Sequence, residues 1–452
     1  AYRRFLDEHV IDPGSVRTPA DFARLPLIDK ANYVHRHPLA DLCRGGRLES
    51  CDMVALSSGS TGQPTPWPRA LADELAVAVR FEQVFRDALR AHEVPTLAVV
   101  CFALGTWVGG MFTTSCVRHL AAKGYRVVAV TPGNNREEIF RAVRELSPAF
   151  GQTVLLGYPP FLKEIVDAGA RAGIDWAARR IRLVMAGEVF SEEWRSLMCA
   201  RIGATDPTRD TASLYGTADA GVLGTETPLS IAIRRFLSRD PEAAHALFGD
   251  RRLPTLVQYD PTYRYFEERD GSLLFTGDNG VPLIRYHIAD TGGLIGFETM
   301  LERLARLGFD PRAELAPGTV LRPLPFAYVF GRSNFAVSYF GANIFPEMVS
   351  IGLEQEAVRD WVTGKFVMEV EEGLENDPTL LLTVELAAGE TAAEERAAMV
   401  ADSVLAQLRR LNSEFAHYVP EARQRPRVEL RPFADPEHFP PGIKHRYTRA
   451  PR

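Results

Sequence analysis

Lysine and cysteine are both scarce in this chain, and each scarcity excludes a class of protein. Five of the 52 basic residues are lysines, the net charge is −6, and no basic cluster alternates with aromatic residues as a nucleic-acid surface requires. The five cysteines are odd in number and show no C-x-x-C spacing, which argues against a disulfide framework and a zinc knuckle. The chain opens with Ala-Tyr-Arg-Arg, which is not typical of a signal peptide. We therefore expect a cytoplasmic protein without a nucleic-acid partner.

The longest stretch without charge, residues 94–117, is long enough to suggest a membrane span. Its internal pattern predicts something else. Residues 97–102 read as a buried strand, Gly105 interrupts the run, 107–122 read as a helix, and 125–130 read as a second strand. This is a β-α-β unit, so we expect no membrane partner.

The same alternation continues along the chain and predicts a layered α/β domain. Helices are expected at 136–146 and 160–172, and strands at 153–156 and 181–186. Short strands between residues 250 and 291 suggest a smaller β-rich subdomain. After a junction at 332–345, strands at 366–371 and 379–386 and a helix at 391–413 predict a small α+β domain.

One short run, Leu56-Ser-Ser-Gly-Ser-Thr-Gly-Gln-Pro-Thr65, is dense in hydroxyl groups and glycines and follows the apolar stretch 53–56. Such a loop can surround a polyphosphate with N–H and O–H donors. It is not a Walker loop, because no lysine follows Gly62. It predicts a nucleotide site, and a plain surface turn is the alternative.

Further short patterns follow each other along the sequence. They are Tyr2-Arg-Arg-Phe-Leu, Leu25-Pro-Leu-Ile-Asp-Lys30, the hydroxyl-rich run, Gly133-Asn-Asn-Arg136, Leu156-Gly-Tyr-Pro-Pro160, Ala186-Gly-Glu-Val-Phe-Ser-Glu-Glu-Trp-Arg195, Leu214-Tyr-Gly-Thr-Ala-Asp219, Pro282-Leu-Ile-Arg-Tyr286, Gly331-Arg-Ser-Asn334 and Gly341-Ala-Asn-Ile-Phe-Pro346. In this order they resemble the motifs of the adenylate-forming superfamily, specifically its phenylacetate-CoA ligase branch. The resemblance extends over nearly the whole chain.

The resemblance implies an α/β fold with a large multi-layer N-terminal domain, including the β-rich subdomain, and a small mobile α+β domain. The expected boundaries are 1–331 for the domain that binds ATP and acid, 332–334 for the hinge at Asn334, and 335–452 for the small domain. It also implies an activity. ATP would activate an aromatic carboxylic acid as acyl-AMP with release of pyrophosphate, and the acyl group would then pass to coenzyme A.

Two alternatives stay open at this point. One is an adenylating enzyme of secondary metabolism whose acceptor is a carrier protein or an amine. The other is an inactive nucleotide-binding homologue. A homodimer is possible.

The resemblance assigns roles to individual residues. The nucleotide would contact Ser57, Ser58, Gly59, Ser60, Thr61, Gly62, Gly187, Glu188, Tyr215, Gly216, Thr217, Asp290 and Arg332. Asp290, rather than Asp278 of the Thr-Gly-Asp tripeptide, takes the ribose by its place after Tyr286. Asp219 would bind the Mg²⁺ of ATP, although the family has the longer Glu there.

The remaining roles concern the chemical step and the acid. Lys444 would neutralise charge between the attacking carboxylate and the α-phosphate. Trp107, Gly109, Tyr158 and Ala186 would line the acid pocket, because Gly and aromatic walls suit a flat apolar acid. Each aromatic residue could equally belong to the core, which is the role we expect for Phe102.

Overall fold

The computed structural model covers the chain from residue 1 to 452 and describes all of it except 58–63, 333–335, 373–377, 440–444, 446 and 449–452. The side chains of Glu74, Arg332 and Glu372 also lie outside the description. None of the described helices is long and apolar enough to cross a membrane.

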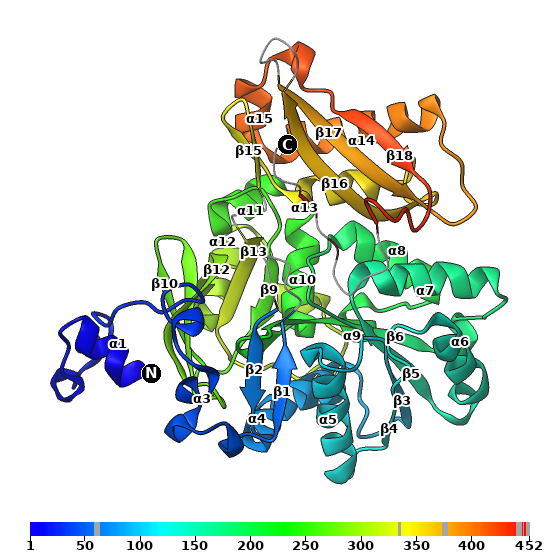
Figure 1. Cartoon of the computed structure of the whole chain (residues 1–452). Coiled ribbons are helices and arrows are strands. Elements are labelled where there is room, and N and C mark those ends of the chain that lie inside the picture. Colours follow the sequence, from blue (N-terminus) through cyan, green and yellow to red (C-terminus); the bar gives the residue numbers. More distant parts are fainter. Residues whose placement is uncertain (58–63, 333–335, 373–377, 440–444, 446, 449–452) are drawn as a thin grey trace.

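A central sheet of 11 strands organises the larger part of the molecule (Figure 1). Five neighbouring strands are parallel to each other, and the rest of the sheet is antiparallel. In spatial order the strands are β10 (Tyr265–Arg269), β11 (Ser272–Gly277), β12 (Leu283–Ile295), β13 (Phe326–Arg332), β9 (Thr255–Gln258), β8 (Gly221–Thr225), β7 (Thr211–Thr217), β6 (Ile181–Ala186), β5 (Gln152–Gly157), β3 (Thr96–Val100) and β4 (Val127–Val130).

Helices cover both faces of the parallel strands because successive strand residues point to opposite sides. Ala98 and Val100 of β3 pack on one face, against α4 (Leu71–Gln83) and α5 (Val108–Ala122). Leu97 and Val99 pack on the other. That face is covered by α6 (Arg136–Glu145), α7 (Pro159–Arg171) and α8 (Glu192–Ile202). The predicted β-α-β unit is present as β3, α5 and β4.

The β-rich part predicted between residues 250 and 291 is hydrogen-bonded into the same sheet. β9 continues from β8 through the pair Thr225 and Gln258, and β13, β12, β11 and β10 follow it. Sequence patterns predict where strands lie but not which strands pair with each other. The connection of the β-rich part to the central sheet was therefore not predicted. The remaining helices of the large part are α1 (Tyr2–Glu8), α2 (Pro19–Phe22), α3 (Leu39–Leu42), α9 (Pro207–Asp210), α10 (Pro228–Leu237), α11 (Pro241–Phe248) and α12 (Phe297–Arg306).

The hydroxyl-rich run lies in a hairpin of β1 (Met53–Leu56) and β2 (Pro66–Arg69). The Thr65 amide donates to Ser57 Oγ at 2.9 Å, and the Ser57 amide donates to the Thr65 carbonyl at 3.0 Å. The Leu56 amide donates to the Thr106 carbonyl at 2.8 Å, which fixes the hairpin beside the start of α5. The loop is therefore attached to the wall of the sheet at its described ends.

Residues after 336 form a unit with its own core, named here the C-terminal unit (Figure 1, top). Its three-stranded sheet packs against α14, and tyrosine, valine and leucine side chains fill the space between them. Its elements are β14 (Val337–Tyr339), β15 (Ala342–Ile344), α13 (Pro346–Leu353), β16 (Val362–Glu372), β17 (Pro378–Leu386), α14 (Glu394–Leu411), α15 (Ser413–Tyr418) and β18 (Arg427–Arg431). The predicted hinge at Asn334 lies outside the described residues.

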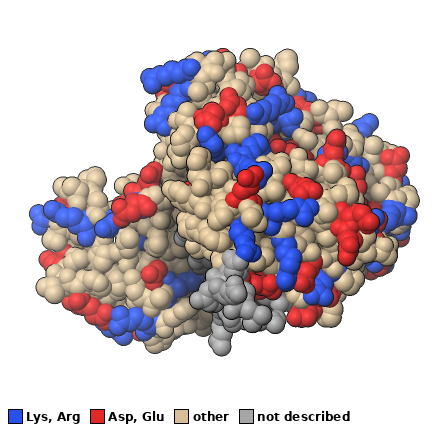
Figure 2. All heavy atoms as spheres, turned by 90° about the horizontal axis from the view of Figure 1, so that it is seen from above, with Lys and Arg blue, Asp and Glu red and all other residues tan. Residues whose placement is uncertain are grey.

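Polar contacts join the C-terminal unit to α7 and α8. Lys163 Nζ donates to the Val362 carbonyl at 2.8 Å, and the Arg201 guanidinium lies 2.9 Å from the Asp360 carboxylate. Lys365 Nζ lies 3.6 Å from Glu164. Acidic and basic side chains are also interspersed on the surface seen in Figure 2. The face between the two units is thus largely polar.

A buried ion cluster holds the segment after β6. Glu226 accepts from Arg195 at 2.7 Å and from Arg234 at 2.8 Å, and the three side chains are at most 2% exposed. Arg234 also donates to the Phe190 carbonyl at 2.8 Å. The Phe190 ring lies under both guanidinium groups, 4.9 and 5.3 Å from their central carbons. The cluster therefore fixes the backbone at the end of the segment 187–190.

We expect Glu226→Ala to lower the free energy of unfolding by about 3–5 kcal/mol. The buried guanidinium groups of Arg195 and Arg234 would then share the single carboxylate of Glu192, which leaves one buried positive charge without compensation. Urea denaturation measures the change. Glu242→Ala is the matched control, because its carboxylate is 69% exposed in the pair with Arg251. The control should change stability by less than about 1 kcal/mol, and equal losses in the two variants would contradict a special role for the cluster.

Candidate functional site

A cavity of about 420 Å³ opens where the parallel strands end and the C-terminal unit meets the sheet. The carboxyl ends of β5, β6 and β7 form its floor, as is usual for ligand sites in open α/β sheets. The start of α5 and residues 56 and 57 at the end of β1 form one side, and residues from β12, β13, α13 and the last described part of the chain close the other.

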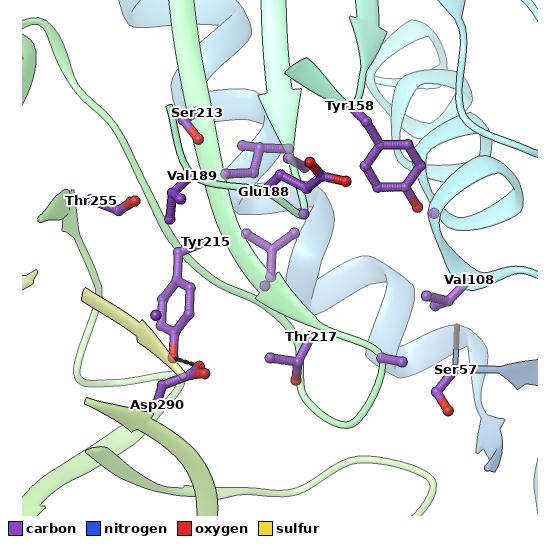
Figure 3. A pocket seen from close by; sticks show the side chains of 18 of the residues that line it. Ser57, Val108, Tyr158, Glu188, Val189, Ser213, Tyr215, Thr217, Thr255 and Asp290 are labelled. Atoms are coloured by element: carbon purple, nitrogen blue, oxygen red, sulfur yellow. Dashed lines mark hydrogen bonds between the residues drawn. The ribbon is translucent and has the colours of Figure 1, made fainter. Parts of the chain in front are cut away.

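The described residues predicted for the site line this one cavity, although more than 200 positions separate the first from the last. Figure 3 shows Tyr215 and Asp290 on one side, Tyr158, Val108 and Ser57 on the other, and Glu188 between them. The predicted residues that line it are Ser57, Trp107, Gly109, Tyr158, Ala186, Gly187, Glu188, Tyr215, Gly216, Thr217, Asp219 and Asp290.

Other predicted residues fall outside the description. They are Ser58, Gly59, Ser60, Thr61, Gly62, Asn334 and Lys444, together with the side chain of Arg332. The backbone of Arg332 pairs with Asp290 across β12 and β13, and Gly331 lines the cavity. The roles of these residues stay predictions.

Tyrosine hydroxyl groups donate to three of the carboxylates that line the cavity. Tyr215 donates to Asp290 at 2.7 Å, Tyr286 donates to Asp219 at 2.6 Å, and Tyr447 donates to Glu188 at 2.6 Å. A phenol orients a carboxylate by a hydrogen bond and leaves its negative charge in place. The three carboxylates are therefore held in fixed directions.

Asp219 is 3% exposed and does not cap its own turn. Its second oxygen lies 3.4 Å from Lys30 Nζ. Lys30 carries the one permanent positive charge among the described residues that line the cavity. The ammonium also lies 5.9 Å from the centre of the Trp67 ring, a cation–π distance.

The described residues do not fit a resident magnesium site. They contain no group of three or more His, Cys, Asp or Glu side chains that could hold a metal. Both oxygens of Asp219 already face donors, Lys30 and Tyr286. The predicted contact of Asp219 with the Mg²⁺ of ATP stays a prediction.

Aromatic side chains form one end of the cavity. Phe102 and Tyr158 meet edge to face, with ring centres 4.9 Å apart, and Trp107 and Phe112 line the same cavity. Burial and the nearby Glu188 raise the pKa of Tyr158 to about 12, so its hydroxyl stays neutral at pH 7. Phe102 was predicted as a core residue and is 2% exposed, and it also lines the cavity. These rings give the cavity an apolar wall that suits a flat apolar group.

Gly187 lets this aromatic end close against the segment 187–190. Its φ is +85°, and a Cβ there would lie 2.5 Å from Cε1 of Tyr158. Any other residue would meet both the strained backbone and the ring.

The last described residues of the chain also reach the cavity, as His445, Tyr447 and Thr448. Burial lowers the pKa of His445 to about 4, so the ring is neutral at pH 7. Its Nε2 lies within hydrogen-bonding distance of the Phe366 carbonyl on β16. Lys444 precedes His445 in the sequence.

Sequence reasoning missed several lining residues. Lys30 belonged to a quoted motif but received no role. Ser213 precedes a quoted motif by one position and could have been found there. The others gave no signal, because their place in the cavity depends on the position of the C-terminal unit; they are Glu347, Ser350, His445, Tyr447 and Thr448.

Known proteins share both sequence and fold with this chain. A stretch of 353 residues is 23% identical to a phenylacetate-coenzyme A ligase of Aromatoleum evansii and covers 77% of this chain and 69% of that protein. A stretch of 292 residues is 24% identical to the phenylacetate-coenzyme A ligase of Thermus thermophilus and covers 64% of this chain and 60% of that protein. No protein-family profile matches the chain.

Among solved structures, 2-hydroxyisobutyryl-CoA ligase in its postadenylation state, with an acyl-AMP bound, aligns with 100% of this chain and 85% of its own. The TM-score is 0.69 and the identity is 17%. The same enzyme in its thioesterification state gives a TM-score of 0.54. The sequence relatives and the shared fold agree with the resemblance seen in the sequence: the chain is similar to the phenylacetate-CoA ligase-like branch of the adenylate-forming superfamily.

Proposed function

We propose that this chain is an AMP-forming acid–CoA ligase that activates an aromatic carboxylic acid. One observation carries the proposal. A single cavity has an aromatic end and a polar end, and the polar end contains Asp290, whose carboxylate is proposed to bind the ribose. Residues from both units line this cavity. The similarity to phenylacetate-CoA ligases and to an enzyme with a bound acyl-AMP supports this interpretation.

The polar end is proposed to hold the nucleotide. Asp290 is 6% exposed and its direction is fixed by Tyr215, so it can accept hydrogen bonds from both ribose hydroxyls. The Tyr215 ring and the Gly216 backbone offer a flat surface to the adenine. Ser57 stands at the base of the hydroxyl-rich loop, which we propose to surround the β- and γ-phosphates.

The aromatic end is proposed to hold the acid. Its carboxylate oxygen would attack the α-phosphorus, an oxygen–phosphorus bond would form, and pyrophosphate would leave with the electrons of the broken bond. The acid is already ionised at pH 7, so the protein supplies position and charge compensation rather than a base. In the second half-reaction a thiol sulfur would attack the acyl carbon, AMP would leave, and the thiol proton would pass to solvent.

Benzoate and arylacetate both fit the proposal, and coenzyme A is the proposed acceptor. Magnesium would arrive with ATP. A cytoplasmic location and a homodimer stay predictions.

Acid-dependent exchange of pyrophosphate into ATP tests the function. We expect exchange with phenylacetate or benzoate, weaker exchange with the small aliphatic 2-hydroxyisobutyrate, and a CoA thioester detected by mass spectrometry. Exchange without thioester would indicate a carrier protein or an amine as acceptor. Absence of exchange with every acid would overturn the proposal in favour of an inactive nucleotide-binding homologue.

Replacing Asp290, the carboxylate proposed to bind the ribose, should weaken the binding of ATP. We expect Asp290→Ala to raise the KM for ATP about 10- to 100-fold, the range for lost charge-assisted hydrogen bonds, with a smaller effect on the KM for the acid. Asp278→Ala is the matched control, because Asp278 is 75% exposed and pairs with Arg44 at the surface. A larger effect at Asp278 than at Asp290 would refute the assignment.

Lys444 is proposed to act in the first half-reaction alone. We expect Lys444→Ala to slow acyl-AMP formation about 100- to 1,000-fold, because a preorganised charge opposite the developing negative charge is lost. Synthetic acyl-AMP should still be converted to the thioester at the wild-type rate. Stopped-flow or quench measurements of the two steps separate these effects, and an equal loss in both would remove Lys444 from this role.

A further inference from the structure

The segment 187–191 is where the cavity wall touches the C-terminal unit. Glu188 accepts from the Tyr447 hydroxyl at 2.6 Å. Ser191, which caps α8, makes a hydrogen bond with the Glu354 carboxyl at the end of α13. Both partners belong to the C-terminal unit. The two hydrogen bonds of this short segment therefore depend on the position of that unit.

Tyr447 is rigidly attached to its own unit. Its carbonyl accepts from the Met368 amide of β16 at 2.8 Å, and Thr448 forms a β-bridge with Met368. The ring lies 5.0 Å from Phe366 and 4.8 Å from His445. A tyrosine has only two side-chain torsions, so little entropy is lost in placing the hydroxyl. The hydroxyl therefore moves only when β16 moves.

The other two tyrosine–carboxylate pairs are of a different kind. Tyr215 and Asp290, like Tyr286 and Asp219, lie on β7, β12 and the turn after β7, all within the central sheet and its loops. Only the Tyr447 pair, among these three, joins the two units. It is the one that must break if the C-terminal unit leaves its present place.

We propose that Tyr447 is a positioning residue for adenylate formation: its hydrogen bond to Glu188 holds the end of the C-terminal unit in the cavity during the first half-reaction and is absent during the second. The proposal rests on the proposed function. The present arrangement agrees better with the postadenylation state of the solved ligase than with its thioesterification state, with TM-scores of 0.69 and 0.54. Tyr447 also follows Lys444 by three positions, so the contact anchors the segment that carries the predicted catalytic lysine.

Protonation is consistent with this role. Desolvation and the neighbouring Glu188, Glu347 and Glu354 raise the pKa of Tyr447, so the phenol remains a donor at neutral pH. Burial raises the pKa of Glu354 to about 8, and the Ser191 hydroxyl donates to the Glu354 carboxyl. Both contacts therefore persist under the conditions in which the enzyme would work.

Tyr447→Phe in the full chain tests the proposal. We expect single-turnover acyl-AMP formation to fall about 10- to 100-fold, as for loss of a hydrogen bond to a charged group. Thioester formation from synthetic acyl-AMP and CoA should stay within about twofold of wild type. A double variant with Glu188→Ala should lose no more adenylation than the worse single variant, because the two residues act through one contact.

Tyr339→Phe is the matched control. Tyr339 is 1% exposed, and its hydroxyl donates to the Arg423 carbonyl at 2.9 Å within the C-terminal unit. We expect this variant to lower Tm and to leave the ratio of the two half-reaction rates unchanged. Equal slowing of both half-reactions in Tyr447→Phe, no slowing of either, or additive losses with Glu188→Ala would overturn the proposal. A wild-type protein that adenylates no acid would instead overturn the proposed function.

Discussion

Negative charge is the constraint on which the rest of this site depends. Four carboxylates and one lysine are among the described residues that line the cavity, namely Glu188, Asp219, Asp290, Glu347 and Lys30. A triphosphate brought there adds more negative charge, and repulsion at low dielectric is strong. Tyrosine hydroxyl groups orient three of the four carboxylates, Glu188, Asp219 and Asp290. Under the proposed function, binding also requires cations from outside this lining, such as the metal of ATP and the predicted Lys444.

Tyrosine is suited to this arrangement because its neutral hydroxyl orients a carboxylate by a hydrogen bond and does not neutralise the negative charge. The proposed nucleotide contact uses that charge. An arginine partner would neutralise Asp290 and take up the oxygens that a ribose must reach. Tyr215 donates to one oxygen of Asp290 and brings no charge of its own. At Asp219 the balance is different, because Lys30 is also present. The two ends of the proposed nucleotide site thus differ in charge, although a tyrosine–aspartate pair lies at each end.

Many strands and several residues of the cavity could be predicted from the sequence. The strand 181–186 is an apolar run between a loop and a Gly, and the structure has it at those residues. Asp290 was preferred over Asp278 by its position after Tyr286, and it is the one that lines the cavity.

The partners of these residues could not be predicted. Glu188 and Tyr447 are 259 positions apart, and their contact depends on how β16 stands relative to β6. Sequence patterns describe the faces of single elements, whereas this contact is set by the placement of one unit on another.

The scarcity of lysine acquires a physical meaning in this arrangement. Arginines form the fixed cluster over the Phe190 ring, where each planar guanidinium group is held by hydrogen bonds on several sides. Lys163 and Lys365 instead lie on the face between the two units, together with Arg201, and Lys123 is in a surface pair with Glu82. An ammonium is a single, strongly hydrated charge that regains water easily when its partner leaves. Under the proposed function the two units must separate between half-reactions, so contacts of this kind at the interface would cost little to break, whereas the arginine cluster keeps the cavity wall in place throughout.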